Sequence, residues 1–346
     1  MGNKKHLLVI RLSAMGDVAM TVPVLKSLLD SYPDLKITVL TKEFLKPIFE
    51  GLDKVTVHVA DVVDSHKGIR GLWKLYNELQ SLQLDAVADL HNVLRSNVLK
   101  QFFRFSGIPF AQIDKGRKEK KALTAKKNKV FAPLKSTHQR YVDVFDQLGY
   151  PFSLPEANFL EKKTLSDKTL EIVGRDNQKW LGIAPFAAFS GKMYPLYLMQ
   201  EVVQKLYNTN RYKIFLFGGG AKEKELLTLW KNDCKECVNI VGKLSFDEEL
   251  ALISNLDLML SMDSGNAHLA AMYGIPIITL WGVTHPYTGF YPYGQDPSNA
   301  LLSDRSSFPL IPTSIYGNKV PKGYQKTMET IDPITIFNKV DQLLNN

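Results

Sequence analysis

The sequence predicts an α/β fold in which two doubly wound, Rossmann-like domains face each other across a cleft. Short apolar runs alternate with segments of helical spacing in both halves of the chain, as they do when parallel strands are joined by helices. At 346 residues the chain is too long for one hydrophobic core of ordinary size. Residues 151–167 are irregular, with mixed charge, and we interpret them as the linker.

The first half contains the elements of one such domain, which we place at residues 1–155. Its last predicted helix is followed by Gly149 and then Pro151, a common stop signal. The strands are predicted at His6–Arg11, Lys36–Thr41, Lys54–His58 and Asp85–Asp89, and the helices at Val18–Ser31, Gly68–Leu82, Leu94–Phe105 and Ser136–Leu148.

The second half repeats this architecture without repeating the sequence, and we place the second domain at residues 156–330. Ligands of doubly wound sheets bind beyond the carboxyl ends of the strands, so the loops after strands are the ones to inspect. The final segment, residues 331–346, contains an amphipathic stretch at Pro333–Leu344 that we expect to pack back across the domains. The strands are predicted at Trp180–Ala184, Tyr212–Phe217, Val238–Ile240, Leu256–Leu260 and Ile275–Leu280, with helices between them.

The composition excludes several classes of protein. A hydrophobic content of 45% and a charged content of 23% are those of a globular chain rather than a disordered one. No apolar run reaches the roughly 18 to 20 residues of a membrane span, and the start of the chain predicts a strand rather than a signal peptide. We therefore expect a cytoplasmic protein. Cys234 and Cys237 lack a second pair that would complete a zinc site, so we expect reduced thiols and no bound metal.

The net charge of +8 comes from one segment. Residues 115–129 hold eight Lys or Arg and one Glu, while the remainder of the chain is nearly balanced. Such a run is either a solvated, mobile loop or an electrostatic clamp for an acidic partner. Because no aromatic residue interrupts it, we expect no nucleic acid and favour a phosphate-rich lipid or a membrane surface. The candidate contacts are Lys118, Lys120 and Lys121.

The residues Ser261–Gly282 place a polar turn and a helix between two predicted strands. The unpaired N–H groups of that helix would suit an anion such as a diphosphate, and Gly265 lets the backbone approach it closely. A carboxylate repels phosphate, so Asp263 would cap the helix, orient the loop or accept from a sugar hydroxyl. The alternative is purely structural: Asp263 and Ser264 only cap the helix, and His268 is a satisfied histidine.

Three other loops after strands carry small or polar residues. Gly16 and Asp17 stand at the entry to a helix, so Asp17 either points its carboxylate into the cleft or caps the helix. The Gly-x-Gly-x-x-Gly spacing of dinucleotide-binding loops is missing there, which disfavours hydride transfer. In the other two loops, Lys192 would supply a point charge to a phosphate and Glu223 would accept from ribose hydroxyls. The accompanying candidates are Ser190, Gly191 and Gly218.

Four segments together resemble the ADP-heptose:lipopolysaccharide heptosyltransferases, which form glycosyltransferase family 9. They are LLVIRLSAMGDVAMTVPVLKSL, DLHNVLRS, GGGAKEKE and SMDSGNAHLAAMYGIPIITLWGVTHP, which span about 280 residues in the expected order. The resemblance implies a GT-B architecture, with the nucleotide sugar on the C-terminal domain and the acceptor on the N-terminal domain. It also implies inverting transfer without a metal or other cofactor.

The same resemblance implies roles for individual residues. Asp17 matches the family's catalytic base and Lys192 its phosphate-binding lysine. Glu223 looks like the ribose contact, and Leu244 falls where an apolar side chain passes along the base. The donor-binding turn corresponds to Asp263, Ser264, Gly265 and His268, with Gly16, Ser190 and Gly218 beside the donor.

The chain departs from the family pattern at a few positions. Ser264 stands where threonine is frequent, and WGVTHP stands where Phe-Gly-Pro-Thr is common. These departures leave the diphosphate site intact but leave the donor sugar open. The implied partners are a nucleotide-sugar donor, ADP-heptose first, and an acidic lipid-linked saccharide acceptor at the cytoplasmic face of the inner membrane.

Three other functions compete with a transferase. A nucleotide-sugar epimerase on the same fold would bind the donor and need no acceptor. A non-catalytic binding protein would keep the donor site and tolerate the loss of Asp17. A nucleic-acid-binding protein is supported only by the basic segment. The combined motifs favour the transferase.

Overall fold

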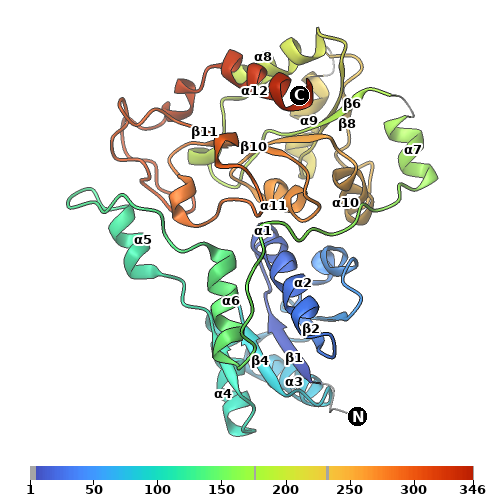
Figure 1. The fold of residues 1–346 in the computed structure, drawn as a ribbon, viewed down its shortest axis with the longest axis vertical. Coiled ribbons are helices and arrows are strands. Elements are labelled where there is room, and N and C mark those ends of the chain that lie inside the picture. The colour runs from blue at the N-terminus through green and yellow to red at the C-terminus, as the bar shows by residue number, and fades with distance from the viewer. Residues whose placement is uncertain (1–4, 175–176, 231–233, 346) are drawn as a thin grey trace. The chain divides into compact units, whose positions relative to one another are not determined.

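The computed structural model describes residues 5–174, 177–230 and 234–345. By their contacts they divide into two compact units, whose course along the chain can be followed in Figure 1. Unit 1 comprises Met1–Gly116 and Lys135–Leu160, and unit 2 comprises Arg117–Leu134 and Glu161–Asn346. Residues 1–4 of the predicted first domain and residue 346 of the predicted final segment lie outside the described residues.

The sheet of unit 1 is parallel, with the order β3-β2-β1-β4-β5. Every residue of β1 is buried because this strand lies at the centre of the sheet. The predicted α/β layering is therefore confirmed, although β5 was not predicted. The strands are β1 (His6–Ile10), β2 (Lys36–Thr41), β3 (Val55–Val59), β4 (Ala86–Asp89) and β5 (Phe110–Gln112).

Helices α3 and α4 pack side by side on one face of this sheet. Leu72 of α3 and Phe103 of α4 join Leu8 and Ile10 of β1 in one hydrophobic core, while α2 packs against α6. The predicted helix at Val18–Ser31 is divided at Met20 into two pieces. The helices are α1 (Met15–Ala19), α2 (Thr21–Ser31), α3 (Gly68–Gln80), α4 (Leu94–Phe105) and α6 (Thr137–Gln147), with a 3-10 helix η1 at Glu43–Phe49.

The sheet of unit 2 is also parallel, with the order β11-β10-β9-β6-β7-β8. Its central strands β6 and β9 carry Leu181 and Leu258 into a core with Met199 of α8 and Leu227 of α9. The strands are β6 (Lys179–Ala184), β7 (Tyr212–Leu216), β8 (Val238–Asn239), β9 (Leu258–Met262), β10 (Ile277–Trp281) and β11 (Ala300–Leu302).

Helices cover this second sheet as well (Figure 1). The α-helices are α5 (Arg117–Leu123), α7 (Asp167–Val173), α8 (Leu196–Tyr207), α9 (Gly220–Trp230), α10 (Phe246–Ser254), α11 (Gly265–Ala271) and α12 (Pro333–Asn345). The 3-10 helices are η2 (Ser190–Lys192), η3 (Pro286–Thr288), η4 (Pro297–Asn299) and η5 (Thr327–Thr330). Helix α12 packs on α8, and Ile336, Val340 and Leu344 enter the core of unit 2. This differs from the expected packing across the domains, because the apolar stripe of α12 is buried within its own unit.

Residues 117–134 interrupt unit 1 in sequence but belong to unit 2 by their contacts. The guanidinium carbon of Arg305 lies 3.5 Å from the centroid of the Phe131 ring, and Lys129 Nζ donates to the carbonyl oxygen of Pro312. Residues 117–123 of the basic run form the helix α5 rather than an irregular loop. The unit boundaries therefore differ from the predicted division at residues 155 and 156.

Cys234 and Cys237 are joined in a disulfide, so the expectation of reduced thiols is wrong. The backbone N–H of Cys237 donates to the carbonyl oxygen of Cys234 at 3.1 Å, which closes a tight turn. This turn brings the two Cα atoms to 5.4 Å, within the range that a disulfide spans.

Candidate active site

The strand order of unit 1 reverses between β1 and β4. The chain runs from β1 outward to β2 and β3 and then returns to the other side of β1. Ligands of doubly wound sheets bind beyond the carboxyl ends of the strands at such a reversal. The segment after β1 leads into α1, which carries Gly16 and Asp17, and the segment after β4 carries His91.

Asp17 is held in place by Arg11. Nη2 of Arg11 lies 2.6 Å from Oδ2 of Asp17, and the two side chains are 8% and 24% exposed. The same oxygen accepts the backbone N–H of Ala14 at 3.4 Å, as an acid in the first turn of a helix often does. Oδ1 of Asp17 accepts no hydrogen bond from any residue that the structure describes. One carboxylate oxygen is thus fixed and the other is left available.

Arg11 follows β1 directly, and the sequence prediction did not identify it as a site residue. Its Nη1 donates to the carbonyl oxygen of Leu90, and its guanidinium carbon lies 5.8 Å from the ring centroid of Tyr141. Burial opposes the charge, but Tyr141 and Asp17 outweigh it, so the pKa of Arg11 is raised. Arg11 therefore stays charged. A basic residue at the end of an apolar strand, just ahead of a polar loop, is the signal that could have found it.

His91 completes the surroundings of Arg11. Its Nδ1 accepts the backbone N–H of Leu12 at 3.4 Å. Burial, and after it the charge of Arg11, lowers the pKa of His91 to about 3. The imidazole is therefore neutral at ordinary pH and acts as an acceptor toward the loop that leads to Asp17.

The strand order of unit 2 also reverses, between β6 and β9. The loop after β6 carries Ser190 and Lys192, and the loop after β9 carries Asp263. Nζ of Lys192 lies 3.0 Å from Oδ2 of Asp263, with side-chain exposures of 16% and 5%. The sequence predicted both residues as parts of one donor site, and the structure joins them in an ion pair. Asp263 thereby orients Lys192.

The turn after Asp263 forms the start of α11. Ser264 is the N-cap residue, but its side chain does not cap the helix, because its Oγ lies 3.1 Å from Oγ of Ser261 instead. Gly265 is the first residue of α11, and His268 is a buried residue one turn further along. The predicted strand–turn–helix order is confirmed. The role of this turn in binding a donor stays a prediction.

Two glycines shape the path of Lys192. A Cβ atom on Gly317, whose φ is +81°, would lie 2.3 Å from Cγ of Lys192, so the lysine stem passes directly over this glycine. A Cβ atom on Gly191 would lie 2.5 Å from the carbonyl oxygen of Gly317. The sequence prediction missed Gly317, and no local pattern marks it, because it lies more than a hundred residues from the lysine that it accommodates.

The remaining donor candidates lie in unit 2 as well. Oε2 of Glu223 accepts the backbone N–H of Gly219 at 2.7 Å, so Glu223 closes the start of its own helix α9. A Cβ atom on Gly218 would lie 3.1 Å from the same oxygen. Leu244 is buried just before α10, and Ser190 is exposed in η2. None of these four contacts Lys192 through a hydrogen bond or ion pair within the described residues.

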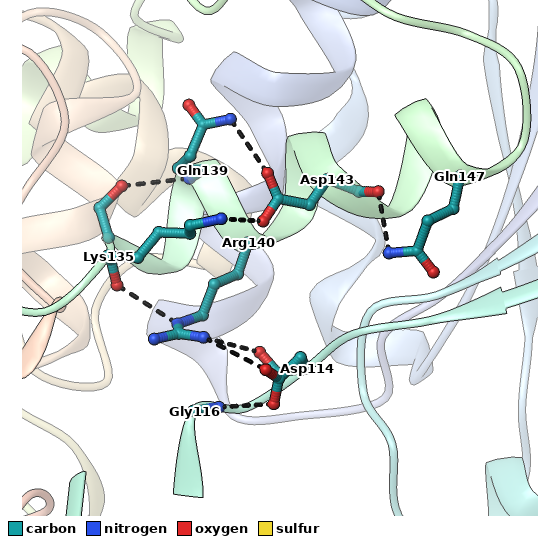
Figure 2. Close-up of polar contacts among 8 residues, drawn as sticks. Asp114, Gly116, Lys135, Gln139, Arg140, Asp143 and Gln147 are labelled. Atoms are coloured by element: carbon teal, nitrogen blue, oxygen red, sulfur yellow. Dashed lines mark hydrogen bonds and ion pairs between the residues drawn. The ribbon is translucent and has the colours of Figure 1, made fainter. Parts of the chain in front are cut away.

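Arg140 of unit 1 holds the chain on both sides of the segment that contains the basic run. Figure 2 shows the Arg140 guanidinium between Lys135 and Asp114: Nε donates to the Lys135 carbonyl at 3.3 Å and Nη1 to the Asp114 carbonyl at 3.2 Å. Gly116, with φ +59°, lies against the same guanidinium, since a Cβ there would be 2.3 Å from Nη2. Arg140 thus holds the points where the chain leaves and re-enters unit 1.

The lysines of α5 do not behave alike. Lys118 and Lys121 are exposed, while Nζ of Lys120 lies 4.6 Å from the ring centroid of Phe290. Lys118 and Lys121 are therefore the better placed of the three to meet an acidic ligand. No helix within the described residues is long and apolar enough to cross a membrane. The described residues also contain no group of three or more His, Cys, Asp or Glu side chains that could hold a metal ion.

Comparison with known proteins identifies the family. Residues 72–309 match the model of glycosyltransferase family 9 (heptosyltransferase). The chain is 25% identical over 287 residues to the lipopolysaccharide core heptosyltransferase OpsX of Haemophilus influenzae, which covers 82% of this chain and 80% of that protein.

Two solved structures share the fold along nearly the whole chain. A family 9 glycosyltransferase from Veillonella parvula has a TM-score of 0.76 at 20% identity, covering 99% of this chain and 98% of that one. The ADP-heptose lipopolysaccharide heptosyltransferase II of Escherichia coli has a TM-score of 0.70 at 20% identity, covering 98% of each chain. The fold is therefore the GT-B fold of glycosyltransferases. The chain belongs to glycosyltransferase family 9, the heptosyltransferases.

Proposed function

We propose that this protein transfers a heptose from ADP-heptose to a lipopolysaccharide core acceptor, with inversion at the anomeric carbon. Membership of family 9 supports the transfer, and the activities for which the H. influenzae and E. coli relatives are named support the donor and the acceptor. The observation that carries the proposal is Asp17, a fixed carboxylate with one free oxygen at the strand reversal of unit 1.

Unit 1 would bind the acceptor and activate it. Asp17 takes the proton of an acceptor hydroxyl while that oxygen forms a bond to the anomeric carbon of the donor. The bond between the anomeric carbon and the diphosphate breaks in the same step, and ADP leaves with the bonding electrons. Arg11 holds the Asp17 carboxylate in one orientation, so little reorganisation is needed when the proton moves.

Unit 2 would hold the donor and stabilise the leaving group. Asp263 forms an ion pair with the Lys192 ammonium, and no other partner for this ammonium occurs within the described residues. The remaining donors suit the diphosphate, on which negative charge develops as ADP departs. The turn at Ser264 and Gly265 would also bind this diphosphate. Glu223 and Leu244 would contact the nucleoside.

The exposed lysines of α5 would meet phosphate groups of the lipid-linked acceptor. Lys118 and Lys121 extend from α5, within the segment 115–129, whose eight Lys or Arg and one Glu account for most of the chain's net charge of +8. Such contacts weaken as salt rises because they are solvent-exposed. The double variant Lys118→Ser/Lys121→Ser is expected to raise the apparent KM for the acceptor and flatten its salt dependence, without changing donor affinity.

The purified protein tests the whole proposal. It is incubated with ADP-heptose and with a lipid-linked core saccharide that lacks heptose, and ADP release and the mass of the saccharide are followed. We expect ADP release only when both are present, with one heptose added to the saccharide. Parallel reactions with UDP- and GDP-sugars establish the preference for the base and the sugar.

Two other outcomes of this experiment would contradict the proposed transfer. Isomerisation of the donor without an acceptor identifies an epimerase. Tight donor binding without any transfer, unaffected by loss of Asp17, identifies a binding protein. The stereochemistry of the new linkage, read from the anomeric coupling in an NMR spectrum, tests inversion separately from transfer.

A further inference from the structure

Helices α3 and α4 of unit 1 expose apolar side chains beside one another. Ile69 and Trp73 of α3 are 72% and 50% exposed, and Phe105 of α4 is 87% exposed. The ring centroids of Trp73 and Phe102 lie 5.0 Å apart, in a T-shaped contact that joins the two helices. Ile69 stands one helical turn before Trp73, and Phe105 one turn after Phe102. We call Ile69, Trp73, Phe102 and Phe105 the apolar strip.

Two residues of the apolar strip are held in place by packing against aromatic neighbours. Phe102 packs against the core that α3 and α4 share with the sheet, and its ring centroid also lies 5.6 Å from that of Tyr76. The Trp73 and Tyr76 centroids are 5.2 Å apart. Trp73 is therefore held by two aromatic neighbours while half of its surface stays in water. Exposed apolar groups that form a connected patch mark interaction surfaces, whereas isolated ones need no explanation.

Positive charges flank the apolar strip. Residues 63–80 and 94–110 hold six Lys or Arg and two Asp or Glu. Arg70 and Lys74 directly follow Ile69 and Trp73 on α3, and Arg104 directly precedes Phe105 on α4. Within the described residues, Arg70 and Arg104 form no ion pair, and Lys74 reaches Glu78 only at 4.0 Å with most of its side chain exposed.

We propose that this face of α3 and α4 docks on an anionic lipid bilayer surface. Tryptophan and phenylalanine favour the boundary between headgroups and acyl chains, and basic residues beside them are attracted to anionic headgroups. Helix α5 has the charge for such contact but no exposed large apolar side chain, since its Leu123 is buried. Unit 1 therefore supplies the membrane contact, and α5 is left for the saccharide phosphates.

The positive charges beside the apolar strip favour a membrane over a second copy of this chain as its partner. A symmetric dimer through the apolar strip would place the same patch of each copy against the other, so Arg70, Lys74 and Arg104 would meet like charges. An anionic bilayer neutralises them instead. This inference rests on the proposed function only in that a lipid-linked acceptor would lie at a membrane. Vesicle binding is measured without donor or acceptor, so its failure leaves the transfer proposal untouched.

The test uses the full chain and vesicles of phosphatidylethanolamine with phosphatidylglycerol, compared with phosphatidylcholine alone. We expect co-sedimentation with the anionic vesicles only, weakening as salt rises. Trp73 serves as a reporter, because Trp230 and Trp281 are buried and Trp180, on β6 of unit 2, is only partly exposed. Brominated lipid in the vesicles should quench part of the tryptophan emission, and Trp73→Phe should abolish that quenching.

Matched variants locate the docking surface. Ile69→Ser/Phe105→Ser changes two highly exposed side chains and should lower vesicle binding roughly tenfold, because the apolar contact is lost. Tyr197→Ser/Leu229→Ser removes exposed apolar side chains from unit 2 and should leave binding unchanged. Equal binding by wild type and Ile69→Ser/Phe105→Ser, or loss of binding only in Lys118→Ser/Lys121→Ser, would overturn the proposal. So would a dimer in sedimentation velocity that the strip variant abolishes.

Discussion

Both units place a cation and a carboxylate at the point where their strand order reverses, but they expose opposite members of the pair. In unit 1 the cation is buried, and Asp17 is the more exposed partner at 24%. In unit 2 the carboxylate is buried, and Lys192 is the more exposed partner at 16%. The same position in two similar folds thus offers a proton acceptor in one unit and a proton-donating positive charge in the other.

The difference shows how a fold is adapted to two chemical tasks without a change in topology. A buried partner fixes its mate through a short ion pair, because water competes little with the interaction there. The exposed member then keeps its remaining hydrogen-bonding groups for a ligand. Substitutions at either point should therefore separate catalysis from donor binding.

Asp17→Asn should have the largest effect. Asparagine keeps the size of the side chain and an oxygen for Arg11, but it cannot take a proton. Transfer should fall by roughly 10²- to 10⁴-fold, the usual range for loss of a general base. Donor affinity, measured by calorimetry with ADP-heptose, should stay the same. Asp30→Asn, on α2 of the same unit and paired with Lys26, serves as the control and should transfer normally. Normal transfer by Asp17→Asn would exclude Asp17 as the catalytic base.

Lys192→Met should instead weaken donor binding. Removing a charge-assisted contact to a phosphate costs about 1.5–3 kcal/mol, or roughly 10- to 100-fold in Kd. The substitution also leaves Asp263 buried without its cation, so the melting temperature should decrease. Lys205→Met removes a lysine of α8 that pairs with Glu201 and should change neither quantity. A donor Kd that stays the same in Lys192→Met would contradict this role.

Gly317→Ala should reproduce part of the lysine effect without removing the charge. The new Cβ would displace the Lys192 stem, and alanine is strained at φ +81° by about 1 kcal/mol. Gly323→Ala carries the same backbone strain at φ +87°, but its Cβ would meet nothing within 4 Å. Both variants should lose stability, and only Gly317→Ala should lose donor affinity, by roughly threefold to tenfold if less than the full contact is lost. Equal donor affinities would show that Gly317 has no influence on Lys192.

Much of the fold could be predicted because its signals are local. The strand β2 and the helix α4 have the bounds that apolar runs and helical spacing indicate. The short strands β5 and β11 escaped detection, since three residues carry too little periodicity. For the basic segment the sequence left a mobile loop open beside an electrostatic clamp, because the contacts that anchor this part of the chain involve Pro312 and Arg305, which lie far along the sequence.

The candidate site was predicted only in part for the same reason. Asp17, Lys192 and Asp263 stand in loops after strands, where position alone draws attention to them. The partners of these loop residues depend on which strands are neighbours in the sheet. The sequence of one parallel strand does not show which strand lies beside it. Gly317 therefore became visible only in three dimensions, as did the ion pairs of Asp17 with Arg11 and of Lys192 with Asp263.

The smallest expected effect concerns a feature that the two units share. Each holds a buried histidine near an arginine: His91 near Arg11 in unit 1, and His285 near Arg305 in unit 2. Burial, followed by the arginine charge, lowers the pKa from 6.5 to about 3 for His91 and to about 4 for His285. Below pH 6.5 the unfolded chain binds protons that the folded chain does not, so stability is lost as pH falls through that window.

His285→Asn tests this in unit 2, because the asparagine oxygen can still accept the backbone N–H of Tyr287 that Nδ1 of His285 accepts. The variant should lose less stability than wild type between pH 6.5 and about 4, and the two curves should run parallel below that. His91→Asn should show the same relief, extending to about pH 3. Melting temperatures over this range measure both. If melting temperature depended on pH in the same way in wild type and variants, the histidines would be taking up protons in the folded chain. The two buried histidine sites would then be alike in geometry but would not lower the stability at acid pH.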